Sequence, residues 1–346
     1  MKGLFDPIDL GNLKLPNRII MAPLTRARAG VSRIPNDLMA TYYAQRATAG
    51  LIITEATSVT PMGVGYADTP GIWSQEQVEG WKKITSAVHA KGGSIVMQLW
   101  HVGRISDPIF LDGQQPVAPS AIAAEGHVSL VRPLKNYVVP RALETSEIPG
   151  IVEAYRIGAA NAKAAGFDGV EIHGANGYLL DQFLQDSTNK RTDKYGGSLE
   201  NRARLPLEVV DAVLTVWDAG NVGYHIAPRA DSHTMGDSNL KATFTYLMEQ
   251  LGERKLAFVF SREHQGEGYL GRDLKKAFGG NYIANQQLDK EVALKLILED
   301  EATAVAFGMD YISNPDLVRK LRDNIPLTPV NKETIYAQGA TGYTDY

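Results

Sequence analysis

Three hydrogen-bonding side chains follow one another where an apolar run of the chain ends. The stretch EIHGANGYLLDQFLQ, residues 171–185, places His173, Asn176 and Tyr178 within six positions. An imidazole and an amide can both donate to one carbonyl oxygen that gains negative charge. A phenol, with an ordinary pKa near about 10, can then protonate a carbon or an oxygen. The same side chains could instead cap backbone groups at a strand-to-helix turn, and the residues alone leave both interpretations open.

Polar residues also stand at the ends of other apolar runs. They are Thr25, Glu55 to Thr57, Gln98, Trp100, His101 and His225, and the last run ends at Gly308 and Met309. His101, His173 and His225 could meet, but no acidic partner accompanies them, so we expect no metal site. Any one of these histidines taken alone is more typical of a structural role.

The apolar runs alternate with segments of helical period, which indicates the elements that position these residues. Strands are predicted over 18–24, 51–59, 93–100, 169–175, 222–228, 255–263, 281–286 and 304–312. Helices are predicted over 35–50, 74–93, 146–166, 198–217, 242–253, 273–280, 290–301 and 314–324. Eight such units predict an α/β fold, a closed TIM (β/α)8 barrel that forms one domain over residues 1–346. In such barrels the active site lies at the C-terminal ends of the strands.

One segment interrupts the alternation between the third strand and its helix. Residues 101–145 are rich in Pro, Gly and Val and show no helical period. Because connections of this length are usually functional, we expect an inserted lid or small β excursion above the barrel.

The composition excludes several classes of protein. Of 346 residues, 44% are hydrophobic and 21% charged, the formal net charge is −4, and there is no cysteine. Disulfides, thiolate metal sites and a cysteine nucleophile are therefore excluded. The charge balance predicts no nucleic-acid or membrane partner, and the lack of a long apolar stretch predicts a cytoplasmic protein.

Several motifs together resemble the Old Yellow Enzyme family of flavin-dependent ene reductases. They run in order along the chain as NRIIMAPLTRAR, GYADTPGIWS, MQLWHVGR, HGANGYLLDQFLQDSTNKRTDKYGGSLENR, AVAFGMDYISNPDL and GYTDY. The resemblance implies an FMN-bearing barrel whose flavin is reduced by NADPH or NADH. The nicotinamide then leaves, and an α,β-unsaturated carbonyl or nitro compound takes its place. It is compatible with a monomer or a homodimer.

The resemblance also assigns roles to particular residues. His173 and Asn176 would bind the carbonyl or nitro oxygen while hydride passes to the β-carbon, and Tyr178 would protonate the α-carbon. Thr25 matches the position whose hydroxyl contacts the flavin carbonyl. Four further positions match the lining of the flavin site, namely Pro23, Leu24, Ala56 and Gln98. Three more match positions that shape the substrate pocket, namely Tyr66, Trp100 and Tyr336.

The chain departs from the family at the fifth strand. The family places an arginine there, close to the flavin edge that becomes negative on reduction, and this chain has His225 in VGYHIAPR. We expect Arg229 to approach instead, or His225 to serve when protonated.

A second departure concerns the FMN phosphate. The arginine expected after Gly308 is Met309, and the glycine-rich turn expected after the seventh strand reads IANQQLD. Backbone N–H groups would then come from Ala284, Asn285 and Gln286, with Arg262 as a possible substitute for the lost guanidinium. Losing one bidentate contact costs about 1.5–3 kcal/mol, so we expect weaker FMN binding or a rearranged phosphate site.

Two alternatives belong to other classes. A flavin-free barrel, such as a lyase or an isomerase, could use the same donors, and a non-catalytic barrel could bind flavin or another small ligand. The lost arginines give the flavin-free alternative some weight.

Overall fold

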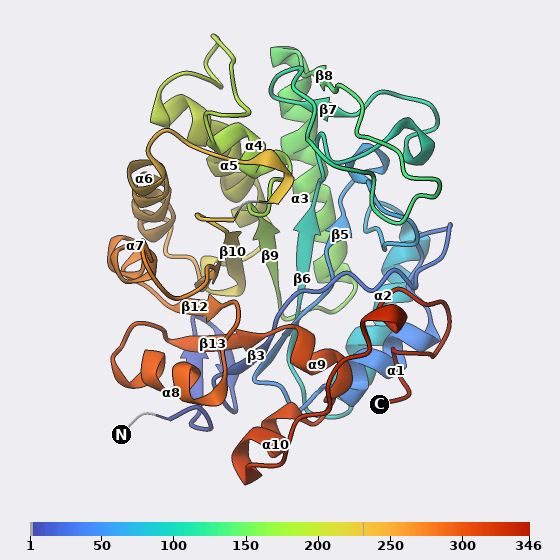
Figure 1. The fold of residues 1–346 in the computed structure, drawn as a ribbon, viewed down its shortest axis with the longest axis vertical. Helices are drawn as coiled ribbons and strands as arrows, with labels where there is room; N and C mark the ends of the chain where they lie inside the picture. Colours follow the sequence, from blue (N-terminus) through green and yellow to red (C-terminus); the bar gives the residue numbers. More distant parts are fainter. Residues whose placement is uncertain (1–2, 231) are drawn as a thin grey trace.

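Eight parallel strands close into a barrel at the centre of the protein (Figure 1). The computed structural model describes residues 3–230 and 232–346. The order around the barrel is β4-β3-β13-β12-β11-β10-β9-β6, and β6 pairs with β4 to complete the circle. The strands are β3 (Ile19–Met21), β4 (Leu51–Ile53), β6 (Ile95–Trp100), β9 (Gly169–His173), β10 (Val222–Ile226), β11 (Phe258–Arg262), β12 (Tyr282–Asn285) and β13 (Ala304–Phe307). The predicted (β/α)8 fold is confirmed.

In the part of the chain that the structure describes, eight helices surround the strands, one for each predicted helical segment (Figure 1). They are α1 (Asp37–Gln45), α2 (Gln75–His89), α3 (Ile148–Ala164), α5 (Leu199–Leu214), α6 (Leu240–Glu253), α7 (Gly271–Phe278), α8 (Lys290–Leu298) and α10 (Leu317–Asp323). Side-chain caps begin several of them. Ser74 accepts a hydrogen bond from the backbone N–H of Gln77 at the start of α2.

Shorter elements lie in the connections. They are β5 (Thr57–Ser58), α4 (Leu179–Leu184), α9 (Met309–Ser313), η1 (Pro61–Gly63), η3 (Thr145–Glu147), η4 (Ala219–Asn221) and η5 (Ser232–Thr234). The predicted strand over 304–312 was wrong in its second half, because β13 ends at Phe307 and α9 begins at Met309. Both halves are apolar, so hydrophobicity alone did not separate them.

The side chains of each barrel strand alternate between two cores. In β12, Tyr282 and Ala284 pack outward with the helices, whereas Ile283 joins the core inside the barrel. In β11, Phe258 and Phe260 face inward and Val259 faces outward. The period of two therefore places the following residues on the inner face at the strand ends: Gln98, Trp100, His173, His225, Arg262 and Asn285.

A two-stranded hairpin closes the lower end of the barrel. The strands β1 (Ile8–Leu10) and β2 (Leu13–Leu15) pair antiparallel. Their leucines, Leu10, Leu13 and Leu15, pack in the same core as the inward side chains of the barrel strands. The N–H of Asn12 donates to the carbonyl of Gly220, just before β10.

Residues 101–145 form an excursion between β6 and α3. It contains η2 (Pro108–Phe110), and β7 (Val117–Ala118) pairs in parallel with β8 (Arg141–Ala142). The buried guanidinium of Arg104 donates to the carbonyls of Ile122 and His233, which ties the excursion to the loop after β10.

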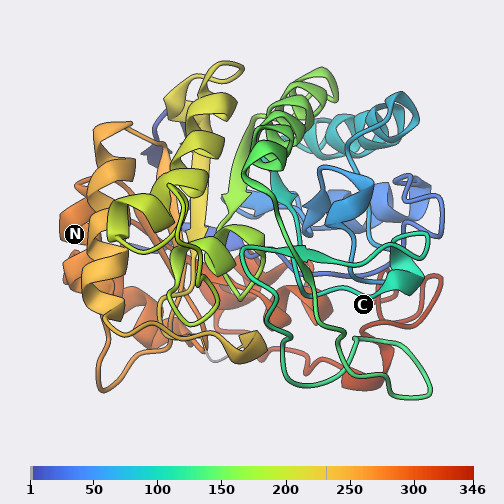
Figure 2. The same ribbon diagram turned by 90° about the horizontal axis from the view of Figure 1, so that it is seen from above.

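The C-terminal segment, residues 331–346, contacts the loop after β3. We call this segment the C-terminal strap; it contains η6 (Lys332–Thr334). Arg26 donates to the carbonyl of Gly342, and Arg28 donates to the carbonyls of Ile335 and Thr341. The strap and the excursion lie on the same side of the barrel (Figure 2).

Candidate active site

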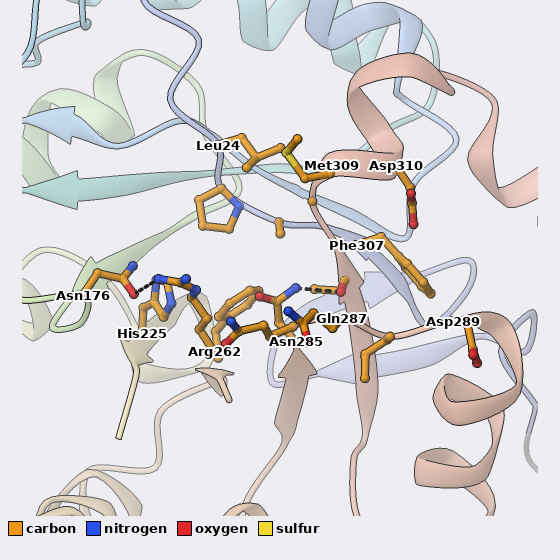
Figure 3. Close-up of a pocket in the computed structure, with 17 residues that line it drawn as sticks. Leu24, Asn176, His225, Arg262, Asn285, Gln287, Asp289, Phe307, Met309 and Asp310 are labelled. Atoms are coloured by element: carbon orange, nitrogen blue, oxygen red, sulfur yellow. Dashed lines mark hydrogen bonds between the residues drawn. The ribbon is translucent and has the colours of Figure 1, made fainter. Parts of the chain in front are cut away.

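A cavity of about 690 Å³ lies at the C-terminal ends of the barrel strands (Figure 3). Its lining comes from the loop after β3, from the loop after β9, from β10 and β11, and from β12 and β13 with the residues that follow them. The lining residues are Ala22, Pro23, Leu24, Asn176, His225, Phe260, Arg262, Asn285, Gln286, Gln287, Leu288, Asp289, Ala306, Phe307, Gly308, Met309 and Asp310. This volume and mixed lining suit a cofactor-sized ligand.

The turn after β9 brings His173, Asn176 and Tyr178 to this end of the barrel. Asn176 and Gly177 have left-handed φ angles of 57° and 78°, which reverse the chain into α4. A Cβ on Gly177 would lie 2.8 Å from Cγ of Met235, so glycine is required there. The rings of His173 and Tyr178 lie 5.0 Å apart, centroid to centroid, and edge to face.

Aromatic side chains enclose Tyr178. Its ring lies 5.0 Å from that of Trp100, and the Trp100 and Tyr66 rings are 5.4 Å apart. The hydroxyl oxygens of Tyr66 and Tyr178 are 2.8 Å apart and share a hydrogen bond. Burial is the largest cause that raises the pKa of Tyr178 above its usual value. Its hydroxyl therefore keeps its proton at neutral pH.

The two histidines of the site are buried and neutral. The His173 and His225 rings stack 4.9 Å apart. Burial, with a smaller effect of the Arg262 charge, lowers the pKa of His173 to about 3. Burial likewise lowers the pKa of His225 well below its usual value, with His173 and Arg262 as smaller causes. The suggestion that a protonated His225 replaces the missing arginine is therefore wrong for physiological pH.

Gln98 connects His225 to a buried carboxyl group. Its amide nitrogen donates to Oε2 of Glu171 at 2.6 Å and lies 3.0 Å from Nδ1 of His225. Because that nitrogen can only donate, Nδ1 accepts and the ring proton sits on Nε2. Nε2 of His225 is buried and has no protein partner among the described residues. His225 thus offers a neutral N–H donor beside the cavity.

The two arginines near the site point in different directions. Nη1 of Arg262 donates to Oδ1 of Asn176 at 2.8 Å (Figure 3). Nε of Arg229 instead donates to Oε1 of Glu263 at 2.5 Å, and its other nitrogens donate to the carbonyls of His264 and Glu267. The prediction that Arg229 approaches the cavity is therefore wrong, because Glu263, in the loop after β11, binds its guanidinium there.

The opposite end of the cavity is acidic rather than basic. Asp289 and Asp310 line it there, away from Asn176 and Arg262 (Figure 3). Met309, which directly precedes Asp310, is 40% exposed. Gln286 and Gln287 have positive φ angles of 103° and 53°, so this turn keeps a backbone shape that favours glycine although glycine is absent.

Several predicted residues are not among those that line this cavity. Thr25 is half-buried beside Leu24, and Ala56 packs with Trp100 in a cluster under the excursion. The side chain of Ala284 packs outward, which leaves only its backbone for a ligand. Tyr336, on the C-terminal strap, is 46% exposed.

The sequence did not single out the carboxyl group of Glu171 or the contact between Arg262 and Asn176. The alternation of inward residues along β9 and β11 was the available signal. In the part of the chain that the structure describes, no cluster of His, Asp and Glu could hold a metal. No described helix is long and apolar enough to cross a membrane.

A (β/α)8 barrel with a cofactor-sized cavity, neutral donors and a protonated tyrosine at the C-terminal ends of its strands has the parts of a cofactor-dependent enzyme. Residues 3–328 match the NADH:flavin oxidoreductase / NADH oxidase family, and the chain belongs to that family.

Relatives agree over nearly the whole chain. The 12-oxophytodienoate reductase 1 of Oryza sativa subsp. japonica is 42% identical over 357 residues, covering 99% of this chain and 92% of the relative. The structure of morphinone reductase in complex with tetrahydroNAD is 48% identical with a TM-score of 0.96, covering 100% of this chain and 97% of that one. An old yellow enzyme homologue from Zymomonas mobilis is 42% identical with a TM-score of 0.97, covering 100% and 99%.

These likenesses confirm the predicted family and activity. The protein is an FMN-dependent ene reductase with NAD(P)H as its reductant. The flavin-free and non-catalytic alternatives find no support among these relatives. The residues present also fit a flavin: Pro23 and Leu24 give one apolar wall, and the unpartnered Nε2–H of His225 offers a donor.

Proposed function

We propose that the cavity reduces the C=C bond of an α,β-unsaturated carbonyl or nitro compound, with His173, Asn176 and Tyr178 as its catalytic residues. The observation that carries this proposal is the convergence of two neutral donors and one protonated phenol at the end of β9, beside the cavity.

His173 and Asn176 bind the oxygen of the substrate and polarise its double bond. Negative charge grows on that oxygen as hydride reaches the β-carbon, and preorganised N–H donors stabilise it. Because His173 is neutral, it donates without giving up its proton. Tyr178 then delivers a proton to the α-carbon, and Tyr66, hydrogen-bonded to it at 2.8 Å, orients its hydroxyl.

Bound FMN supplies the hydride, and the chain's own residues hold the cofactor. Pro23 and Leu24 line one wall of the cavity, and Thr25 and Ala56 would also contact the flavin. Gln98 orients His225, whose Nε2–H would donate to the flavin ring. At the far end, the backbone of Ala284, Asn285 and Gln286 with Gly308 and Met309 would hold the phosphate. Tyr66, Trp100 and Tyr336 shape the space for the substrate.

Replacing Tyr178 with phenylalanine tests the proton-donor role. We expect oxidation of the reduced enzyme by 2-cyclohexenone to slow by about 10²–10⁴-fold, the usual contribution of a positioned acid. Reduction by NADPH or NADH should keep its rate, because no proton from Tyr178 is needed there. Anaerobic stopped-flow absorbance of the flavin measures both steps.

Tyr246→Phe, on α6, is the matched control and should leave both rates unchanged. Equal slowing of both half-reactions in Tyr178→Phe would contradict the proton-donor role. A nitroalkene as second oxidant separates binding from protonation, because both substrates place an oxygen on the same two donors.

We also propose that residues 1–346 act as one domain and that the excursion, residues 101–145, serves as a lid. Support comes from its Ala124, Val128 and Tyr137, which pack in one cluster with Trp100 and Ala56. Shortening the excursion should raise KM for small alkenes more than it changes kcat.

The cellular setting is likewise a proposal. The absence of cysteine supports a reducing, cytoplasmic location, and the net charge of −4 gives no support for a nucleic-acid partner. We propose a monomer or a homodimer, which sedimentation at several protein concentrations distinguishes.

A further inference from the structure

Among the described residues that line the cavity, Arg262 is the only arginine or lysine, and the mechanism above does not use it. It is the last residue of β11, and the inward Phe258 and Phe260 precede it at a spacing of two. The strand therefore delivers a cation to the same end of the barrel as the substrate donors.

The guanidinium of Arg262 holds the side-chain amide of Asn176 in one of its two orientations. Its Nη1 donates to Oδ1 of Asn176 at 2.8 Å and lies 3.5 Å from the hydroxyl of Ser232 (Figure 3). A hydrogen bond from a charged donor is stronger than one between neutral groups. A flipped amide would turn its N–H groups toward the guanidinium, so two donors would face each other. Arg262 therefore leaves the N–H groups of Asn176 for another acceptor.

The backbone of Asn176 is held as well. Its left-handed φ of 57° fixes the direction of the side chain, and its carbonyl accepts from Nδ1 of His233 at 2.7 Å. Both ends of the residue are thus held before a ligand arrives. Donors placed in advance at a developing negative charge are the most effective ones.

Arg262 also carries the positive charge that His225 lacks. His173 and His225 are neutral, and the charge of Arg262 is one of the causes that keep them so. Transmitted through the amide, this charge increases the acidity of the N–H groups of Asn176 and favours an anionic oxygen beside them.

We propose that Arg262 is a positioning residue for ene reduction, which directs the amide of Asn176 toward the substrate oxygen and supplies positive charge to that oxygen through it. This proposal rests on the proposed role of Asn176 and does not assign Arg262 to the FMN phosphate.

The test compares wild type, Asn176→Ala, Arg262→Met and the double variant, each loaded with FMN. Oxidation by 2-cyclohexenone should slow by about 10–100-fold in Arg262→Met, less than for a lost oxyanion donor. The double variant should be no slower than Asn176→Ala, because Arg262 acts through that residue. The FMN dissociation constant, from flavin fluorescence, should not change in Arg262→Met.

A ligand titration gives a readout independent of turnover. Binding of 4-chlorophenol is measured against pH, which yields the ratio of affinities for its phenolate and phenol forms. The phenolate preference should fall in Arg262→Met and survive in Arg262→Lys, which keeps the charge but loses the planar fork. Arg272→Gln, an exposed arginine on α7, is the control and should behave as wild type.

Each result decides between the two roles. Wild-type oxidation rates in Arg262→Met, losses that multiply in the double variant, or a matching loss of FMN affinity would each overturn the proposal. Should Arg262→Met fail to fold, Arg262→Gln, which removes the charge, carries the test, and an oxidation rate and a phenolate preference both equal to those of wild type would refute the proposal. A normal rate in Asn176→Ala would instead remove the function proposed for Asn176 itself.

Discussion

Glu171 is a carboxyl group buried at the centre of the barrel with neutral neighbours. Its Oε2 lies 3.9 Å from Nδ1 of His225, and its other oxygen has no partner among the described residues. Burial is the main cause that raises its pKa to about 8, and the hydrogen bond from Gln98 offsets only part of this rise. A cation at position 225 would hold this carboxyl ionised, and the neutral imidazole does not.

The raised pKa of Glu171 predicts how stability depends on pH. Between the ordinary value of 4.5 and about 8 the folded protein holds a proton that the unfolded chain has lost. Stability contributed by this group therefore falls as pH rises through that window. Glu171→Gln keeps the hydrogen bond from Gln98 and removes the ionisation. The melting temperature of Glu171→Gln relative to that of wild type should therefore increase as pH rises from 5 to 8. The corresponding change in the difference in unfolding free energy is on the order of a few kcal/mol.

Thermal melts by circular dichroism at several pH values measure this difference. Glu249→Gln, on α6, is the control for removing one carboxyl group. A gap between Glu171→Gln and wild type that stays constant with pH would show that Glu171 ionises normally.

Because position 309 holds methionine instead of arginine, we expect a weak contact with the FMN phosphate. Met309→Arg should lower the FMN dissociation constant by about 10–100-fold, as a bidentate contact of 1.5–3 kcal/mol implies. The gain should shrink as salt is added, because the new contact is electrostatic. Fluorescence titration of the flavin-free protein measures it, with Met309→Gln as the uncharged control. No gain in affinity would place the phosphate away from position 309.

At the scale of the elements, the strand ends decide which side chains meet. Arg262 and Asn176 are 86 positions apart, and the register that pairs Arg262 with Asn285 brings the guanidinium to the inner face. Apolar runs bounded by Gly and Pro predicted the eight strands well, because every barrel strand is covered on both faces. The position of Arg262 at the end of its strand was readable, but its partner was not.

Other parts of the site depended on burial and loop contacts that local sequence does not carry. The neutrality of His225 follows from its buried position, and the direction of Arg229 follows from Glu263 in a loop of no regular period. The motif around His173, Asn176 and Tyr178 predicted their proximity because all three belong to one short turn.

The turn after β12 predicts a stabilising substitution. Gln286 has a φ of 103°, a region that residues with a Cβ enter only under strain. Gln286→Gly should therefore raise the free energy of unfolding by about 1 kcal/mol, since relief of strain outweighs the greater entropy of the unfolded chain. Urea unfolding at constant m-value measures the change.

Gln338→Gly, on the exposed strap, is the control for the effect of glycine on the unfolded chain. A lower stability of Gln286→Gly would mean that the side chain of Gln286 makes a contact worth more than the strain.

At the scale of the whole molecule, different segments of the chain cover the two ends of the barrel. Leu10, Leu13 and Leu15 of the hairpin fill the lower end, while the excursion and the C-terminal strap border the upper one. Three buried arginines, Arg26, Arg28 and Arg46, donate to backbone carbonyls and so fasten the C-terminal part of the chain beside the site.

The closure of the lower end of the barrel by the β1–β2 hairpin has a kinetic consequence for the whole enzyme. Reductant and alkene enter the cavity in turn from the same end of the barrel, so an inert phenol bound there should compete with each of them when the other reactant is saturating. Initial rates with one reactant varied and the other saturating, with 4-chlorophenol added, measure this, and non-competitive inhibition under those conditions would point to a second binding site. The turnover rate then depends on the ratio of the two reactants as well as on their concentrations, because an excess of one occupies the cavity and prevents the other from binding.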